Sequence, residues 1–174
     1  MYFQHFGKIL YDPIGDNNPK LMTNIMSRVR VRANMKKEMV MLDPYDIQEG
    51  ETPEIVADKH HGSPYYHWVV MLLNNISDVY HDWPKSTRKL QQYLTNKHTD
   101  TQLDEAHHYE VAQSSGGAWV KIKVESDVAG AVAVTNYEYE ATLQDVKREI
   151  RILQPQFLGQ FKAEFGQLLE EAKD

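Results

Sequence analysis

A central stretch of the sequence carries a run of helix start and stop signals that leaves it few alternative folds. Thr52 is a good N-cap and Pro53 suits a first helical position, so a helix is expected over residues 53–60. Gly62 ends it, because glycine most easily takes the left-handed conformation after a helix. Ser63 then caps a second helix, whose apolar residues recur at helical spacing: Tyr65, Trp68, Val69, Leu72 and Leu73. We expect two short helices joined by a tight turn.

Extended segments are expected on both sides of these helices. Residues 39–48 read as an extended stretch that enters a tight turn at Glu49 and Gly50, and residues 79–81 would supply a returning strand. The order strand, helix, helix, strand gives a βααβ unit within residues 41–84. So small a unit has little core of its own and needs neighbouring elements.

The N-terminal segment, residues 1–40, is expected to form an extended arm. It combines a short extended piece, a turn at residues 16–19 and a short helix capped by Thr23 or Asn24. Arginine and valine then alternate, which places three arginines on one face of a strand: Arg28, Arg30 and Arg32. This face is either a solvated edge strand protected by its charge or the binding site of an acidic partner.

The next segment, residues 85–118, is predicted to be a linker that contains one helix, capped by Ser86 or Thr87, and then a loop over residues 96–104. Its last residues, Ser-Ser-Gly-Gly, read as a flexible break. No further regular element is expected in this polar stretch.

The C-terminal segment, residues 119–174, is expected to hold a β-hairpin followed by helices. Apolar and polar residues alternate over residues 120–124 and again over 132–139, which predicts the two strands of the hairpin. A helix over 140–153 follows, and beyond Pro155 a second amphipathic helix carries an apolar stripe of Phe157, Phe161, Phe165, Leu168 and Ala172. The stripe covers either a partner protein or the chain's own hairpin. These segments together predict an α+β fold.

Composition excludes several functions. The chain of 174 residues has a net charge of −6 and only 19 lysines and arginines, so it offers no basic surface for nucleic acid. It has no cysteine, which excludes disulfides and thiolate chemistry. The N-terminus does not resemble a signal peptide, and the longest apolar run, residues 68–73, is too short to cross a bilayer. We therefore expect no membrane or nucleic-acid partner.

No residue pattern indicates catalysis, a cofactor or a metal. The histidine pairs at residues 60–61 and 107–108 are adjacent rather than spaced for chelation, and the first pair is expected to form a solvated helix end. The glutamates at 49, 51 and 54 cluster at an exposed turn and helix start, where negative charge suits the helix dipole. Residues 114–117 lack both a nucleophile elbow and a phosphate-binding loop.

Residues 45–57, His61-Gly62 and Asn74-Asn75-Ile76 together resemble the LysM module. The resemblance covers roughly residues 45–81 and implies a βααβ fold. It also implies a possible groove for peptidoglycan or chitin oligosaccharides, formed by Gly50, Glu51, Thr52, Pro53, Asn74, Asn75 and Ile76. His61 departs from the tyrosine or phenylalanine that the module usually carries there, and the second helix is unusually apolar.

A resemblance to a second family extends over nearly the whole chain. Gly62-x-Pro64-x-Tyr66-x-Trp68-Val69-Val70-Met71-Leu72-x-Asn74, followed by Asp82-Trp83-Pro84, is similar to the baseplate wedge subunit fifty-three family of T4-type phages. So are the N-terminal Phe6-x-Lys8-Ile9-x-Tyr11-Asp12 and the C-terminal Tyr137-Glu138-Tyr139-Glu140. The resemblance implies a structural, non-enzymatic subunit, made in the host cytoplasm, that clamps neighbouring wedge proteins in the baseplate of a contractile tail.

Two functions follow as alternatives. As a wedge subunit the chain would bind other baseplate and tail proteins, because tyrosine, phenylalanine and arginine side chains commonly anchor interfaces. The expected contact residues are Arg28, Arg30, Arg32, Tyr65, Tyr66, Phe157, Phe161 and Phe165. As a LysM module it would bind a glycan in the groove instead, although the single copy and the apolar second helix argue against this.

Overall fold

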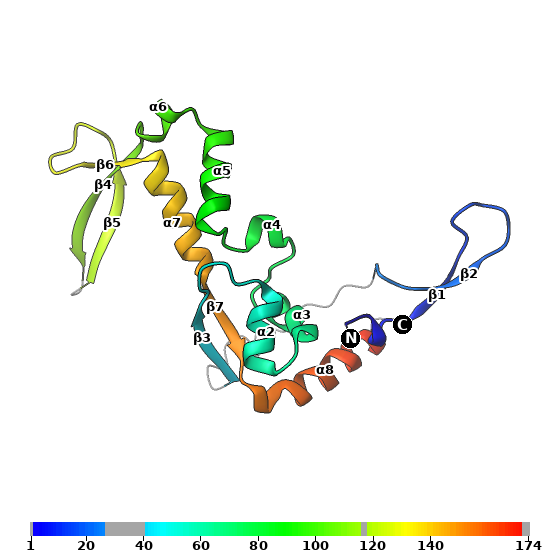
Figure 1. Ribbon diagram of the computed structural model, residues 1–174. Helices are drawn as coiled ribbons and strands as arrows, with labels where there is room; N and C mark the ends of the chain where they lie inside the picture. Colours follow the sequence, from blue (N-terminus) through cyan, green and yellow to red (C-terminus); the bar gives the residue numbers. More distant parts are fainter. Residues whose placement is uncertain (1, 27–40, 116–117, 172–174) are drawn as a thin grey trace. The chain divides into compact units, whose positions relative to one another are not determined.

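The fold is described from a computed structural model that covers residues 2–26, 41–115 and 118–171 (Figure 1). It contains both helices and strands, which confirms the predicted α+β class. The chain divides into two compact units. Unit 1 consists of residues 1–79 together with 150–174, and unit 2 is the intervening stretch, residues 80–149.

The centre of unit 1 is the predicted pair of helices. Helix α2 (Pro53–His61) is followed by a turn of 3-10 helix, η3 (Pro64–Tyr66), and helix α3 (His67–Leu73). The Thr52 hydroxyl accepts a hydrogen bond from the backbone N–H of Ile55, and Gly62 closes α2 with a φ of 70°. These caps confirm the predicted position of α2, whereas the Ser63 hydroxyl caps η3 and α3 begins only at His67.

The strand that returns to β3 (Leu42–Asp46) comes from far along the chain. Its partner is β7 (Glu149–Leu153), and the backbone N–H of Gln154 donates to the Met41 carbonyl at 3.0 Å, which places the end of β7 beside the start of β3. The prediction of a returning strand at residues 79–81 is wrong, because those residues begin helix α4 (Val79–Asp82). The helix predicted to reach residue 153 ends at Arg148. The next five residues form strand β7 instead, and alternate residues of this strand point into the core.

The core of unit 1 gathers segments from both ends of the chain. The Trp68 ring on α3 lies 4.7 Å from the Phe165 ring of helix α8 (Leu158–Glu171), which follows the short turn η4 (Pro155–Phe157). Tyr2 of η1 (Tyr2–His5) touches both rings. The buried cluster contains Phe6, Leu42, Trp68, Val69, Leu73, Leu153, Phe161, Phe165 and Leu169. The apolar stripe of α8 therefore packs on the chain itself, on α3 and η1.

The described part of the N-terminal arm contains a small hairpin. Strands β1 (Lys8–Tyr11) and β2 (Lys20–Thr23) pair antiparallel, and every residue of both strands is exposed. The Asp12 carboxylate organises the turn by accepting from the N–H groups of Ile14, Gly15 and Asn17. A two-stranded hairpin that covers no core has little stability of its own in water.

Unit 2 contains a three-stranded antiparallel sheet and its helices. The sheet order is β5–β4–β6, from β4 (Ala106–Ser115), β5 (Ala118–Val124) and β6 (Val132–Thr135), and the helices are α5 (Thr87–Lys97), α6 (Asp100–Leu103) and α7 (Asn136–Arg148). Ser86 caps α5 as predicted. The predicted hairpin of residues 120–124 with 132–139 is wrong, because both strands pair with β4, which lies within the expected linker.

The start of α7 explains why the strand predicted to reach residue 139 is short. Thr135 and Glu138 form a capping box: the Thr135 hydroxyl accepts from the Glu138 N–H, and the Glu138 carboxylate accepts from the Thr135 N–H. This reciprocal pair ends β6 and begins α7. Farther along α7 two buried polar groups contact other parts of unit 2, since Gln144 accepts from the backbone of Lys85 and Glu140 forms an ion pair with Lys97.

The packing of α8 gives a first prediction. Replacing Phe165 by alanine removes a buried ring from between Trp68 and Tyr2, and we expect the free energy of unfolding to fall by about 3–5 kcal/mol. Urea denaturation followed by tryptophan fluorescence measures this change. Val146→Ala on α7 is the control, because that side chain is exposed, and its effect should stay below about 1 kcal/mol. Equal losses in the two variants would contradict the assignment of Phe165 to the core.

Candidate partner interface

The turn that enters α2 is built around one buried carboxylate. Glu51 accepts hydrogen bonds from the Tyr45 hydroxyl at 2.8 Å and the Gln48 backbone N–H at 2.9 Å, and it forms an ion pair with Lys59. Burial alone would raise the pKa of this carboxyl, but the bonds from Lys59, Gln48 and Tyr45 outweigh burial and hold the pKa below its usual range. Glu51, one of the predicted groove residues, therefore fixes the turn between β3 and α2.

The Asn74-Asn75-Ile76 motif has a structural function as well. The Asn74 side chain donates to the Arg151 carbonyl at 2.8 Å and accepts from the Arg151 N–H at 2.9 Å, as the backbone of a neighbouring strand would. Asn75 takes a left-handed conformation with a φ of 55°, and the N–H of Ile76 bonds to the Met71 carbonyl. This arrangement closes α3 as a Schellman motif and ties it to β7.

His61 joins the end of α2 to the end of β7. Its Nε2 lies 2.9 Å from the Leu153 carbonyl, and within the described residues its buried Nδ1 has no hydrogen-bond partner. Burial lowers the pKa of the imidazole, since a proton added at Nδ1 would have no acceptor. The expectation that both histidines of this pair are solvated is wrong for His61.

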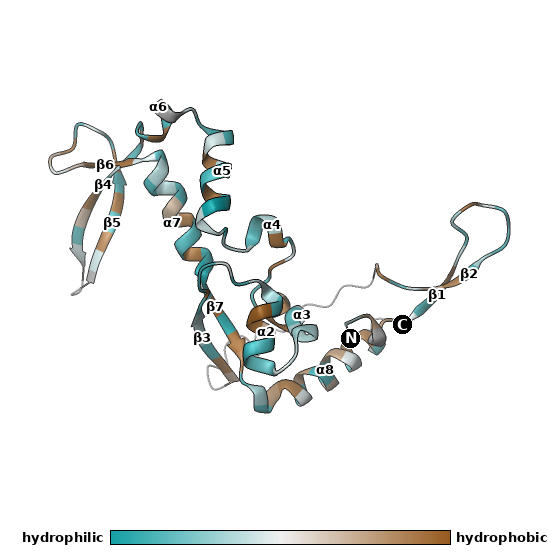
Figure 2. Cartoon of the chain, viewed as in Figure 1, coloured by the Kyte–Doolittle hydropathy of each residue, from teal (hydrophilic) through white to brown (hydrophobic). Residues whose placement is uncertain are grey.

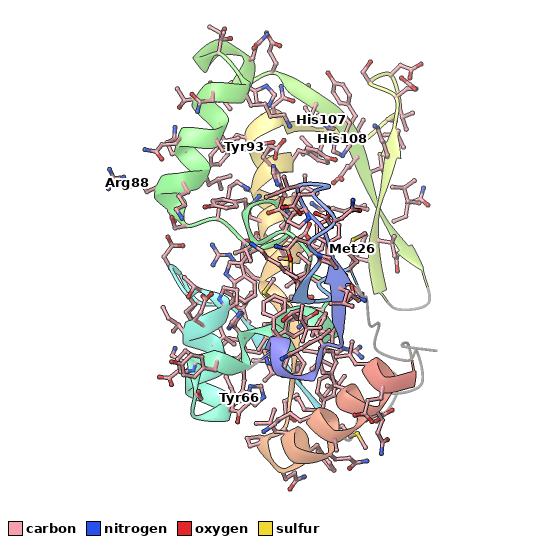
Figure 3. All side chains as sticks on the ribbon, turned by 90° about the vertical axis from the view of Figure 1, so that its right-hand side faces the viewer. Met26, Tyr66, Arg88, Tyr93, His107 and His108 are labelled. Atoms are coloured by element: carbon pink, nitrogen blue, oxygen red, sulfur yellow. The ribbon has the colours of Figure 1, made fainter. Side chains whose placement is uncertain are left out.

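The residues predicted to contact a partner fall into three groups. Tyr65 lies exposed on η3, with 62% of its surface accessible, and stays a predicted contact. Tyr66 turns toward α8, where the Lys162 ammonium lies 5.2 Å from its ring, so this side chain is held within unit 1 (Figure 3). Phe161 and Phe165 are buried in the core, which corrects their assignment to a partner surface. Phe157 is only partly buried against the core and stays a predicted contact. The arginines at 28, 30 and 32 lie outside the described residues.

Exposed apolar side chains that the predicted site left out gather on two pairs of strands. The β1–β2 hairpin and its flanks expose Leu10, Ile14, Leu21, Ile25 and Met26. In unit 2 the β4–β5 ribbon exposes Trp119, Val120 and Ile122, and hydrophobic and hydrophilic positions alternate along its strands (Figure 2). Strand alternation was visible in the sequence for β5, but exposure depends on which elements cover each face. Exposed large apolar side chains of this kind are candidates for interaction sites.

The histidines of β4 lie side by side and belong to one aromatic group (Figure 3). His107 stacks on Tyr139 with ring centroids 3.9 Å apart, and His108 Nε2 lies 3.0 Å from a Glu110 carboxylate oxygen. Within residues 2–26, 41–115 and 118–171, no three or more histidine, aspartate or glutamate side chains come together as metal ligands do. In the same ranges, no helix has the length and hydrophobicity that a bilayer crossing requires.

Together these features define a small α+β subunit whose core is closed and whose outer strands leave apolar surface uncovered, as the components of larger assemblies do. Comparison with protein families identifies the assembly. The family of base plate wedge protein 53 matches residues 1–129 of the 174, and the chain belongs to this phage family. This confirms the wedge resemblance read from the residues. Its role is therefore structural, in the baseplate of a virion, and no curated protein matches the chain.

The Glu51 network predicts a pH dependence. Because folding lowers the pKa of Glu51, its stabilising effect is full above the ordinary carboxyl value of 4.5 and is lost as pH falls through the lower folded value. Glu51→Gln should therefore cost about 1–3 kcal/mol at pH 7 and much less near pH 3. Urea denaturation at both pH values measures the difference. Glu170→Gln, at an exposed site on α8, serves as control, and a Glu51→Gln cost that does not change with pH would contradict the prediction.

Asn74 gives a second prediction at this surface. Asn74→Ala leaves the N–H and carbonyl of Arg151 without their partner, and we expect a loss of about 1–3 kcal/mol in the free energy of unfolding. Asn75→Gly keeps the left-handed conformation and should change stability by less than about 0.5 kcal/mol. Thermal and urea unfolding distinguish the two. If both variants were equally stable, Asn74 would not join α3 to β7.

Proposed function

We propose that this protein is a wedge subunit of a contractile phage tail that clamps neighbouring wedge proteins together as the baseplate assembles. The observation that carries the proposal is the β1–β2 hairpin, whose strands are exposed on both faces although each face carries at least two apolar side chains. Such a hairpin gains its stability from what it packs against. A neighbouring wedge protein would supply that surface.

Two separate surfaces support a clamp rather than a single contact. The hairpin and the exposed Tyr65 belong to unit 1, whereas the β4–β5 ribbon with Trp119 belongs to unit 2. A subunit that joins two different neighbours needs two different faces. Large aromatic and aliphatic side chains on each face would provide the anchors that dominate binding energy.

The glycan alternative has less support. Three of its expected polar groups already bond within the chain. Glu51 bonds in the turn before α2, the Thr52 hydroxyl bonds at the start of that helix, and the Asn74 amide bonds to the backbone of β7. A sugar-binding groove needs such groups directed at the ligand. We therefore retain the LysM-like groove only as an alternative outcome of the test below.

Co-purification tests the proposed function. The full chain should form a stable complex with the tail proteins encoded beside it, and Leu10→Ser with Leu21→Ser should weaken that complex at least about tenfold, because both side chains are exposed and apolar. Thr95→Ser, on the exposed face of α5, is the matched control. A pull-down on purified peptidoglycan runs in parallel. Retention by peptidoglycan without any tail partner would overturn the proposal in favour of the glycan alternative.

A further inference from the structure

Strand β5 forms one edge of the sheet in unit 2. Its seven residues pair with β4 on one side, from Ala118 opposite Ser115 to Val124 opposite Tyr109. Among the residues that the structure describes, no strand pairs with its other side. The backbone N–H and C=O groups along that side are thus a template for an added strand.

The two faces of β5 differ sharply in chemistry. Val120, Ile122 and Val124 lie on one face, and the register places Val111 and Tyr109 of β4 beside them. Trp119, Lys121 and Lys123 lie on the opposite face, where Trp119 is 77% exposed. A strand that pairs with β5 places its own side chains directly beside these, in alternation.

The two central antiparallel registers of β5 with the β5 strand of a second copy are unfavourable. If two β5 strands paired antiparallel about Ile122, Lys121 of each would lie opposite Lys123 of the other, and pairing about Lys121 would place that residue opposite itself. Like charges directly opposite each other destabilise a strand pair. Edge lysines also disfavour uncharged strands, because pairing would remove part of the ammonium's hydration.

The positive charge of this face has two acidic groups near it, Glu110 of β4 and Glu138 of α7. Glu110 of β4 lies opposite Lys123 in the strand register. One of its carboxylate oxygens lies 3.4 Å from the Lys121 ammonium, and the other bonds to His108. The side chain of Lys121 remains 76% exposed, so this ion pair is weak. The Glu110 carboxylate is already shared between Lys121 and His108, which leaves room for further acidic groups beside the lysines.

We propose that β5 receives an extended segment of a neighbouring baseplate protein as an added strand, and that this segment alternates apolar and acidic residues. The acidic side chains lie beside Lys121 and Lys123, and the apolar side chains extend the surface of Val120, Ile122 and Val124. Because successive side chains of a strand point to opposite faces, such a segment places its acidic residues on one face and its apolar residues on the other, whether it runs parallel or antiparallel to β5. The inference rests on the proposed function, and it specifies the partner's chemistry at the unit 2 surface.

Peptide binding to the full chain tests this inference. A fluorescent peptide that alternates valine with glutamate should bind, and the same peptide with lysine in place of glutamate should bind at least about tenfold more weakly. The double substitution Lys121→Glu with Lys123→Glu should reverse that preference. Lys8→Glu with Lys20→Glu, on the β1–β2 hairpin, is the matched control and should leave it unchanged. Equal binding of both peptides would overturn the inference.

Two further measurements test whether the peptide adds as a strand and whether the lysine charges attract it. Amide exchange along β5 should slow when the acidic peptide binds, because its outward N–H groups become hydrogen bonded, and unchanged exchange would overturn strand addition. Lys121→Gln with Lys123→Gln removes the charge without placing new carboxylates beside Glu110, and it should weaken binding of the acidic peptide if the fold is intact by circular dichroism.

Co-purification separates this inference from the proposed function. If the chain enters a complex with tail proteins and the charge-reversed variant enters it equally well, the edge of β5 is not a binding site, whereas the wedge function stands. If the unaltered chain enters no such complex, the wedge function itself fails.

Discussion

The pairing of β3 with β7 is the contact on which the rest of unit 1 depends. Its partners are distant in sequence: Asp43 and Gln154, whose side chains bond beside the pair, are 111 residues apart. The core takes Leu42 from the segment that begins β3, Leu153 from β7 and three further side chains from α8. Helices α2 and α3 are too short to bury their apolar faces on each other alone. Only the return of residues 150–171 gives them a core.

Much of the fold could be predicted where the signal is local. Caps and breaks at Thr52, Gly62 and Ser86 positioned their helices correctly, because a cap is a contact between residues a few positions apart. The partner of β3 could not be found this way. Ile150 and Leu153 fit helical spacing, whereas Ile150 and Ile152 fit strand alternation, and short apolar runs do not distinguish the two. The Thr135-x-x-Glu138 capping box, in contrast, is a local signal in the sequence that marks the start of α7.

The candidate site was less predictable, since exposure depends on which tertiary neighbours cover a side chain. The stripe of Phe161 and Phe165 had the pattern of a partner surface, yet it packs on Trp68. Tyr65 and Tyr66 are adjacent, but η3 turns one outward and holds the other beside Lys162. Periodicity shows that residues share a face and leaves open what covers it. Motif spacing has a similar limit, because the Asn74-Asn75-Ile76 spacing is accounted for by closure of α3 and needs no ligand.

The discontinuity of unit 1 has a consequence for the order in which the protein forms on the ribosome. Unit 2 is a continuous stretch, so all of it leaves the exit tunnel before residues 150–153 of β7 do. Unit 2 can thus fold while unit 1 still lacks a strand and α8. Closing unit 1 over the intervening chain adds little entropic cost, because loop entropy grows only with the logarithm of length. Synthesis itself therefore sets an order in which unit 1 is completed only after all of unit 2 has been made.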